Sequence, residues 1–160
     1  MQTAPRIRPA TRDDLPRIGT LGALLVTEHH DFDPQRFLAA GDQTPARYAS
    51  FIGSQLDEPD AVVLVAEDGG NVIGYVYGSV EGYDYMSLRG PAGVLQDIIV
   101  DPAYRGRGIG RLLLRAILDQ LKSRGVPRVV LSTAAGNAVA QKLFASAGFR
   151  RTMIEMTREM

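Results

Sequence analysis

Three segments of this chain are rich in Val, Ile, Leu and Tyr, and they restrict the folds that the chain can adopt. They are residues 61–67 (AVVLVAE), 72–80 (VIGYVYGSV) and 94–100 (VLQDIIV). β-Branched and aromatic residues favour strands, and the four residues DGGN between the first two segments are typical of a tight hairpin turn. We therefore predict an antiparallel pair of strands followed by a third strand.

A helix is predicted after the third strand. Residues 111–125 (RLLLRAILDQLKSRG) repeat apolar side chains at helical spacing and end in a basic residue followed by glycine, as helix C-termini often do. The next apolar segment is residues 128–132 (RVVLS). Because a helical crossover returns the chain in its original direction, this strand is predicted to lie parallel to residues 94–100.

The first third of the chain is predicted to be mostly helical. After a short strand at residues 5–9, Thr11 and Asp14 have the spacing of a capping pair, which predicts a helix to about Glu28. A cap residue followed by proline is typical of helix N-termini. Two more helices are therefore expected to begin at Asp33-Pro34 and at Thr44-Pro45.

The last part of the chain is predicted to hold one more helix and one more strand. Asn137 opens a helix that runs to about Ala147 and ends at Gly148. Residues 152–159 (TMIEMTRE) read as a final strand. Together the elements predict an α/β (α+β) fold, a mixed sheet flanked by helices.

Composition limits the size and the class of the protein. The 160 residues, 45% of them hydrophobic, suit one domain over residues 1–160. Lys and Arg number 18, as do Asp and Glu, so the net charge is zero and we expect no nucleic-acid partner. No stretch reaches the roughly 18 apolar residues that span a bilayer, and no apolar signal segment opens the sequence. We therefore expect a cytoplasmic protein without a membrane partner.

Metal-binding side chains are scarce. Cysteine is absent, which excludes disulfides, thiolate–metal sites and a cysteine nucleophile. The two histidines, His29 and His30, are adjacent and too few for a zinc site. We expect no metal cofactor.

Residues 104–110 (YRGRGIG) place three glycines and two arginines between the third strand and its helix. Glycine is unfavourable in a helix, so another requirement must select it. Glycines let backbone N–H groups approach a phosphate, which the positive end of the helix dipole then faces. The alternative to a phosphate site is a glycine-rich loop that only starts the helix. The Walker motif is missing, and the glycine spacing does not fit the dinucleotide fingerprint.

These features together resemble the GNAT superfamily of N-acyltransferases. The resemblance rests on the strand that ends in residues 100–102 (VDP), on the motif R-x-x-G-x-G at 105–110, and on Asn137 with residues 143–149 (LFASAGF) after one more strand. It covers nearly the whole chain, and its specific part runs over about 94–149. It implies a mostly antiparallel sheet that splays apart before the strand at residues 128–132.

The resemblance also implies acetyl-CoA as acyl donor and a primary amine, on a small molecule or a peptide, as acceptor. Backbone groups on the splayed edge would pair with the pantetheine arm, namely those of Ile98, Ile99 and Val100. The loop and the helix start would hold the pyrophosphate through N–H groups and positive charge, namely Arg105, Gly106, Arg107, Gly108, Ile109, Gly110 and Arg111. Asn137 would contact the pantetheine or a water, although its residue type also fits a helix N-cap.

The residues expected to carry the chemistry depart from the family's pattern. In many members a tyrosine on the last helix protonates the leaving thiolate, but the matching residue here is Phe144, which is expected to pack beside the pantetheine. Gln96-Asp97 stands where some members have a Glu-Asp pair, and Ser132 where others have a glutamate. Asp97 is therefore the candidate general base, directly or through a water. A structural carboxylate bonded to backbone is the alternative.

Candidate contacts to the acceptor are Glu28, His30 and Tyr77. The segment TEHHDFDP at residues 27–34 would lie near the acceptor site of the family, although paired histidines also suit a solvated helix end. Tyr75 and Tyr77 share one face of their strand, where core packing is an equal alternative.

The activity predicted from these residues is N-acetyl transfer from acetyl-CoA to an amine. A non-catalytic acyl-CoA-binding or sensing module of the same fold is the alternative. A homodimer is a further expectation.

Overall fold

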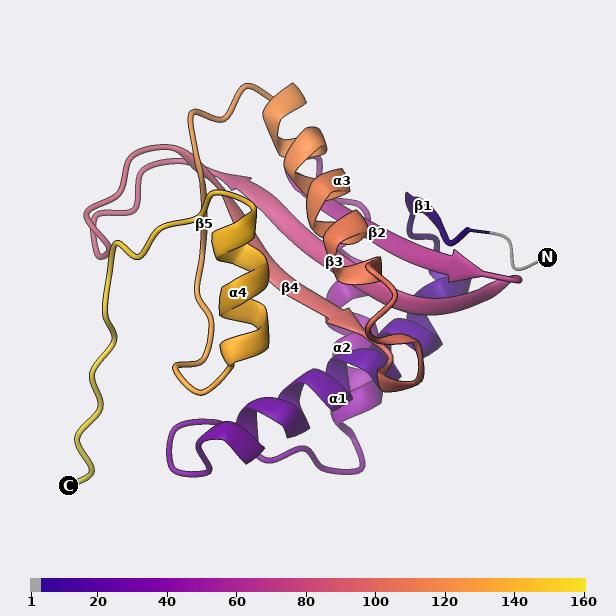
Figure 1. Ribbon diagram of the computed structural model, residues 1–160, viewed down its shortest axis with the longest axis horizontal. Helices are drawn as coiled ribbons and strands as arrows, with labels where there is room; N and C mark the ends of the chain where they lie inside the picture. Colours follow the sequence, from indigo (N-terminus) through magenta and orange to yellow (C-terminus); the bar gives the residue numbers. More distant parts are fainter. Residues whose placement is uncertain (1–3) are drawn as a thin grey trace.

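The computed structural model describes residues 4–160, which form a five-stranded sheet between two pairs of helices (Figure 1). The strands are β1 (Arg6–Pro9), β2 (Ala61–Asp68), β3 (Asn71–Glu81), β4 (Ala92–Val100) and β5 (Val129–Leu131). The helices are α1 (Leu15–Phe32), α2 (Thr44–Gln55), α3 (Ile109–Ser123) and α4 (Ala138–Ser146), with short 3-10 turns at Arg12–Asp14 and Pro102–Tyr104. Strands β1 to β4 are antiparallel in chain order, and β5 is parallel to β4. The predicted fold class is confirmed.

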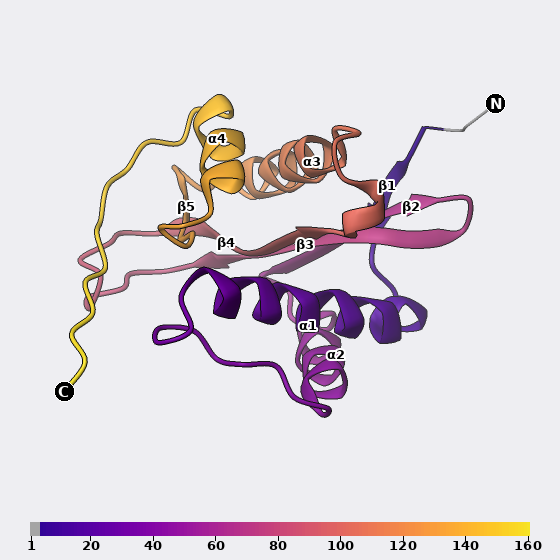
Figure 2. The same ribbon diagram turned by 60° about the horizontal axis from the view of Figure 1, so that its bottom comes forward.

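Two hydrophobic cores lie on opposite faces of the sheet. Figure 2 shows α1 and α2 on one face and α3 and α4 on the other. The α3 face buries Leu113, Leu114 and Ile117, because their helical spacing forms one stripe against β2 and β3. The other face packs Ile18 and Ile52 on the sheet. The central strands are therefore buried on both sides and read as continuous apolar runs.

Turn residues end β2 and α3 where the sequence predicts, whereas α1 continues past its expected end near Glu28 to Phe32. Gly69 and Gly70 adopt left-handed φ values of 56° and 83° in the β2–β3 hairpin, and Gly125 does so at 80° just after α3. The Asp14 carboxylate accepts a hydrogen bond from the Thr11 backbone N–H at 2.8 Å, which confirms the capping pair.

Two predicted elements are wrong. Asp33-Pro34 does not open a helix, because Asp33 is the C-cap of α1 and its carboxylate instead accepts the backbone N–H of Gln35 at 3.2 Å in a turn. Residues 152–159 do not form a strand. A strand requires a paired backbone, and residues 150–160 make no backbone–backbone hydrogen bond within residues 4–160.

The helices of residues 4–160 include none whose length and apolar character would let it cross a membrane.

Candidate functional site

The sheet opens between β4 and β5. Their pairing joins Gly93–Leu95 to Val129–Leu131 and stops there, although β4 continues to Val100. On the β5 side, residues 96–100 therefore have no strand partner within the described chain. The predicted splay of the sheet is confirmed, and it leaves a strand edge that could pair with an extended ligand.

The glycine loop carries a row of free backbone donors beside that edge. Gly106 and Gly108 have φ values of 76° and 77°, a left-handed conformation that glycine adopts at least cost, and Gly108 is the N-cap of α3. Among residues 4–160, no backbone oxygen or side chain accepts the N–H groups of residues 106–111; Leu112 is the first to donate, to the Gly108 carbonyl at 3.1 Å. Six free N–H groups at a helix N-terminus form a site suited to an anion.

Gly110 differs from the other two glycines of the loop. A Cβ there would lie at ordinary contact distance, 3.6 Å from a Leu143 methyl and 3.9 Å from a Val100 methyl. Neither φ nor space within the chain demands glycine at this position, so close approach of a ligand remains the explanation that the sequence suggested.

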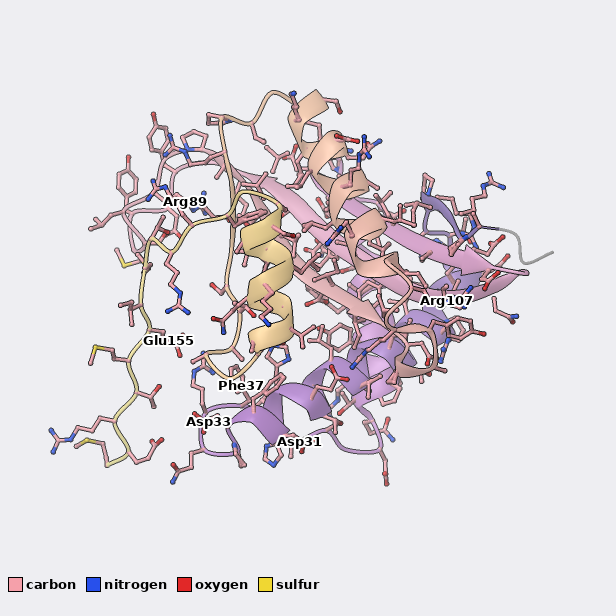
Figure 3. The ribbon with its side chains drawn as sticks, in the orientation of Figure 1. Asp31, Asp33, Phe37, Arg89, Arg107 and Glu155 are labelled. Atoms are coloured by element: carbon pink, nitrogen blue, oxygen red, sulfur yellow. The ribbon has the colours of Figure 1, made fainter. Side chains whose placement is uncertain are left out.

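The two arginines of the loop are engaged within the protein. Arg105 donates from Nε to the Val100 carbonyl at 2.9 Å and from Nη2 to Glu28 at 2.6 Å. Arg107, labelled in Figure 3, donates to Asp68 at 3.2 Å and lies over the ring of Tyr104. Both guanidinium groups are partly exposed, so either can exchange its carboxylate partner for a phosphate.

A β-bulge sets the direction of Asp97. Tyr77 pairs with Asp97 while the next residue of β3, Gly78, pairs with Leu95, so Gln96 is an extra residue in β4. Leu95 packs in the α3 core and Ile99 in the core under α1 and α2. Without the bulge, the alternation of a strand would put Leu95, Asp97 and Ile99 on one face. The bulge turns Asp97 toward α1 and α2.

Two tyrosines converge on Asp97. The hydroxyls of Tyr48, from α2, and Tyr75, from β3, each donate to Asp97 Oδ2 at 2.9 Å. Burial raises the pKa of Asp97 above its ordinary value, and the two hydroxyls lower it in part. Asp97 Oδ1 has no hydrogen-bond partner within residues 4–160. It is not fully buried, so it can accept a hydrogen bond from a donor outside the chain.

Tyr48 is a site residue that the sequence reasoning missed. Its ring reaches Asp97 because Gly22 of α1 leaves room: a Cβ at Gly22 would lie 2.2 Å from the Tyr48 ring. Gly19, one turn earlier, lets α1 approach the Pro45 carbonyl in the same way. The pair of glycines three residues apart inside a predicted helix was the available signal for this close helix contact.

The last turns of α1 lie beneath the open edge of β4. Glu28 reaches the glycine loop through Arg105, and the Phe32 ring contacts Gly136 in the β5–α4 loop, 3.5 Å from the position of a Cβ there. His29, between them, is within electrostatic reach of Asp97. Its Nδ1 lies 2.8 Å from the Leu25 carbonyl, which can only accept, so Nδ1 carries the proton and Nε2 is a free acceptor in the neutral ring.

None of the remaining predicted residues hydrogen-bonds to Asp97 within residues 4–160. His30 Nδ1 lies 2.9 Å from the Phe37 carbonyl, and the Tyr77 hydroxyl donates to Gln55 at 2.9 Å. Asn137 is the N-cap of α4, accepting the Ala140 N–H at 3.1 Å through Oδ1, which leaves its amide N–H₂ free. Phe144 is buried in the α3 core. Within residues 4–160, no three His, Cys, Asp or Glu side chains gather as metal ligands would.

Comparisons with known proteins agree with this geometry. Residues 24–149 match the acetyltransferase (GNAT) family. The chain is 36% identical to the mycothiol acetyltransferase of Thermobispora bispora over 97 residues, 58% of this chain and 31% of that protein. It is 32% identical to the N-alpha-acetyltransferase RimI of Mycobacterium tuberculosis over 139 residues, 82% of this chain and 78% of that protein. The chain thus spans about a third of the first of these relatives and most of the second.

Solved structures share the fold over almost the whole chain. A mutant of the BH1408 protein from Bacillus halodurans superposes with a TM-score of 0.83 at 23% identity, covering 97% of this chain and 99% of that one. A predicted acetyltransferase from Clostridium acetobutylicum, solved with acetyl-CoA, has a TM-score of 0.75 at 16% identity, with 96% of each chain covered.

Proposed function

Because the chain belongs to the acetyltransferase (GNAT) family, we propose that it transfers an acetyl group from acetyl-CoA to a primary amine of a small molecule or peptide. The observation that carries this proposal is the row of six free N–H groups at residues 106–111, set beside the unpaired edge of β4. One feature suits a pyrophosphate and the other an extended amide-containing arm, and CoA has both. Relatives named mycothiol acetyltransferase and N-alpha-acetyltransferase support acetyl transfer to an amine.

The chain's residues divide the binding of CoA between them. The N–H groups of residues 106–111 hold the pyrophosphate, helped by Arg105 and Arg107, which exchange their carboxylate partners for phosphate oxygens. The edge of β4 over Ile98–Val100 pairs with the pantetheine arm, and the free amide of Asn137 contacts it from the start of α4. When bound, acetyl-CoA supplies a thioester activated toward an amine.

Asp97 receives the proton of the attacking amine in this proposal. Its Oδ1 is free, and its pKa is raised by burial, so the carboxylate is a stronger base than an exposed aspartate. Tyr48 and Tyr75 hold the carboxylate by Oδ2 and leave Oδ1 without a hydrogen-bond partner within residues 4–160. Phe144 offers no proton to the departing thiolate, which leaves with water as its proton donor.

The alternative, a module that binds acyl-CoA without transferring the acyl group, is favoured by one observation. Phe144 is buried and carries no hydroxyl at the position expected to protonate the thiolate. This alternative makes the same prediction for CoA binding and a different one for turnover. Residence in the cytoplasm and a homodimeric state remain predictions from the sequence.

The first test measures CoA binding by calorimetry on Gly108→Val. The new Cβ branches would stand in front of the free N–H groups, so CoA affinity should fall more than 100-fold. Gly125→Val is the matched control: Gly125 has the same left-handed φ, no atom within 4 Å of its Cβ, and a place at the other end of α3. Both variants bear the same backbone strain, about 1–2 kcal/mol. Equal CoA affinity in the two variants would refute the assignment of the loop.

The second test separates the enzyme from the binding module. Saturating acetyl-CoA is mixed with a panel of primary amines that includes peptide N-termini, polyamines and amino sugars, and free thiol is followed. Thiol release that depends on an amine and is lost in Asp97→Asn supports the enzyme. CoA binding without amine-dependent release supports the module.

A further inference from the structure

His29 is a proton-binding side chain at the candidate site, and the steps proposed above do not use it. Its Nδ1–H donates to the Leu25 carbonyl at 2.8 Å, one turn back along α1, and its Nε2 has no hydrogen-bond partner within residues 4–160. Histidine is the side chain whose ordinary charge change falls between pH 5 and 8. The neutral ring therefore offers Nε2 as a free proton acceptor in a fixed tautomer.

The face of α1 that carries His29 also contacts the site. Gly22, Leu25 and His29 are three and four residues apart, so they lie on one face of the helix. Gly22 packs against the ring of Tyr48, whose hydroxyl donates to Asp97 at 2.9 Å. His29 lies two turns further along the same face, within electrostatic reach of Asp97. One helix face thus contacts the tyrosine that holds the carboxylate and carries a free base near the carboxylate itself.

Two aromatic rings hold the imidazole of His29 in place. The rings of Phe32 and Phe37 meet it edge to face, with centroids 6.1 and 5.1 Å away. Phe32 in turn contacts Gly136 of the β5–α4 loop. These contacts and the bond to the helix backbone restrict rotation of the imidazole, so Nε2 keeps one direction. A histidine that only suits a solvated helix end requires no such contacts.

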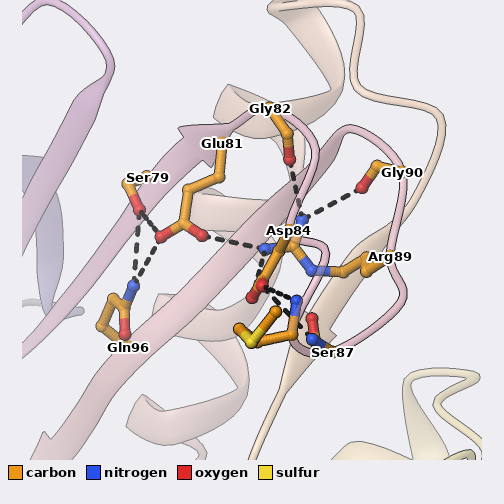
Figure 4. A network of polar contacts seen from close by, with 9 residues as sticks. Ser79, Glu81, Gly82, Asp84, Ser87, Arg89, Gly90 and Gln96 are labelled. Atoms are coloured by element: carbon orange, nitrogen blue, oxygen red, sulfur yellow. Dashed lines mark hydrogen bonds and ion pairs between the residues drawn. The ribbon is translucent and has the colours of Figure 1, made fainter.

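A polar network fixes the bulge that turns Asp97 toward α1 and α2 (Figure 4). The extra residue of β4, Gln96, donates from its side-chain amide to the Glu81 carboxylate of β3 at 3.1 Å, and Arg89 donates to the same carboxylate at 2.9 Å. The bulge therefore cannot move along β4 without breaking these contacts. Asp97 stays on the sheet face that α1 covers, with Oδ1 free.

The charge of Asp97 differs from the other charges around His29. Asp97 is partly buried and forms no ion pair within residues 4–160, and its partners Tyr48 and Tyr75 are neutral because burial raises the pKa of each hydroxyl. Glu28, next to His29 on α1, is already paired with Arg105 at 2.6 Å. The other titratable or charged groups at this end of α1 and in the loop after it are His30, on the Phe37 carbonyl, and the exposed Asp31, Asp33 and Arg36.

We propose that His29 relays protons for Asp97: the proton that Asp97 takes from the attacking amine passes through a water to His29 Nε2 and from there to solvent. This inference rests on the proposed acetyl transfer. The amine proton goes to Asp97 Oδ1, the carboxylate is restored when Nε2 accepts the proton, and the imidazolium then loses it to bulk water. No hydrogen bond joins the two side chains in the described chain, so a water bridges them. His29 acts through Asp97 and does not itself contact the amine.

The first test follows amine-dependent thiol release against pH, with the amine of the panel above that the wild type accepts best. In His29→Asn the side-chain amide can still donate to the Leu25 carbonyl but cannot take a proton. We expect kcat/KM to fall about 10- to 100-fold near pH 7, with KM for acetyl-CoA unchanged, and the histidine limb of the pH profile to disappear. His30→Asn is the matched control, and its profile should equal that of the wild type. A lower rate with an unchanged pH profile in His29→Asn would overturn the relay.

Chemical rescue separates a relay from a structural contact. His29→Ala leaves space for a free imidazole molecule beside Phe32 and Phe37. Added imidazole should raise thiol release by His29→Ala several-fold and should not change release by His30→Ala. If imidazole has no effect on His29→Ala, His29 only fills space and the relay is wrong.

The last test requires neither an acceptor nor turnover. The positive charge of His29 lowers the pKa of Asp97, so in His29→Asn the ¹³C carboxyl signal of Asp97 should titrate at higher pH than in the wild type, whereas His30→Asn should leave it unchanged. An unchanged Asp97 midpoint in His29→Asn overturns the relay and leaves the proposed activity standing. A wild type that releases no thiol with any amine overturns the activity, and the relay falls with it.

Discussion

Tyr48→Phe should raise the pKa of Asp97, the residue that we propose as the general base. The change removes one of the two hydroxyls that donate to Asp97 Oδ2 and keeps the ring that packs against Gly22. Burial already raises this pKa, and the hydrogen bond from Tyr48 opposes that effect. A hydrogen bond to a charged group contributes about 1.5–3 kcal/mol, and one pKa unit corresponds to about 1.4 kcal/mol. We therefore expect an upward shift of about 1–2 units.

The assay needs no knowledge of the acceptor. The protein is labelled with ¹³C at aspartate carboxyl groups, the Asp97 signal is assigned by its loss in Asp97→Asn, and its shift is followed against pH. Tyr77→Phe is the matched control, because Tyr77 lies on the same sheet face but donates to Gln55 at the same 2.9 Å. An unchanged Asp97 midpoint in Tyr48→Phe, or an equal shift in Tyr77→Phe, would refute the reasoning.

The same change has a consequence for stability. The folded protein holds the Asp97 proton more tightly than the unfolded chain, so the free energy of unfolding falls as pH rises from the unfolded pKa of about 3.9 to the raised folded pKa. Tyr48→Phe extends this fall to higher pH. The variant should therefore lose more stability at pH 8 than at pH 4, as measured by urea unfolding. A loss independent of pH would mean that the hydroxyl does not stabilise the carboxylate.

Three further predictions follow from contacts around the site. Gly22→Ala should push the Tyr48 ring aside and lower the free energy of unfolding by about 1–3 kcal/mol, measured by urea unfolding; an unchanged value would mean that α1 and α2 separate freely. Glu28→Gln should release Arg105 for phosphate and tighten CoA binding several-fold by calorimetry, whereas weaker binding would show that Glu28 positions the loop. Raising the salt concentration should weaken CoA binding less in Arg105→Gln than in the wild type. The same dependence of CoA affinity on salt concentration in both proteins would mean that Arg105 does not contribute its charge to CoA binding.

Local patterns in the sequence predicted most of the fold. The hairpin of β2 and β3, the helix after the glycine loop and the parallel return to β5 depend on neighbouring residues, on side-chain period and on turn chemistry. Such signals act over a few residues and need no knowledge of the rest of the chain. The two failures have the same origin. Asp33-Pro34 follows a helix as readily as it starts one, and residues 152–159 have strand propensity without a strand partner.

The candidate site was predictable only where it is local. The glycine loop and Asp97 were found because a motif and an interrupted strand are visible along the chain. Tyr48 was not, because its hydroxyl meets Asp97 across 49 residues and through the room left by Gly22. The contact of Arg105 with Glu28 spans 77 residues and was likewise invisible.

The sequence by itself determined most elements of this protein, the glycines of the loop before α3 and the carboxylate inside an apolar strand, since propensity and periodicity are properties of short segments. The tertiary structure decided which way that carboxylate points and what surrounds it. One extra residue, Gln96, in β4 reverses the face that Asp97 occupies, and this bulge exists only in the register of β4 against β3. Pairing register and helix packing balance contacts between distant segments, so no local pattern encodes them.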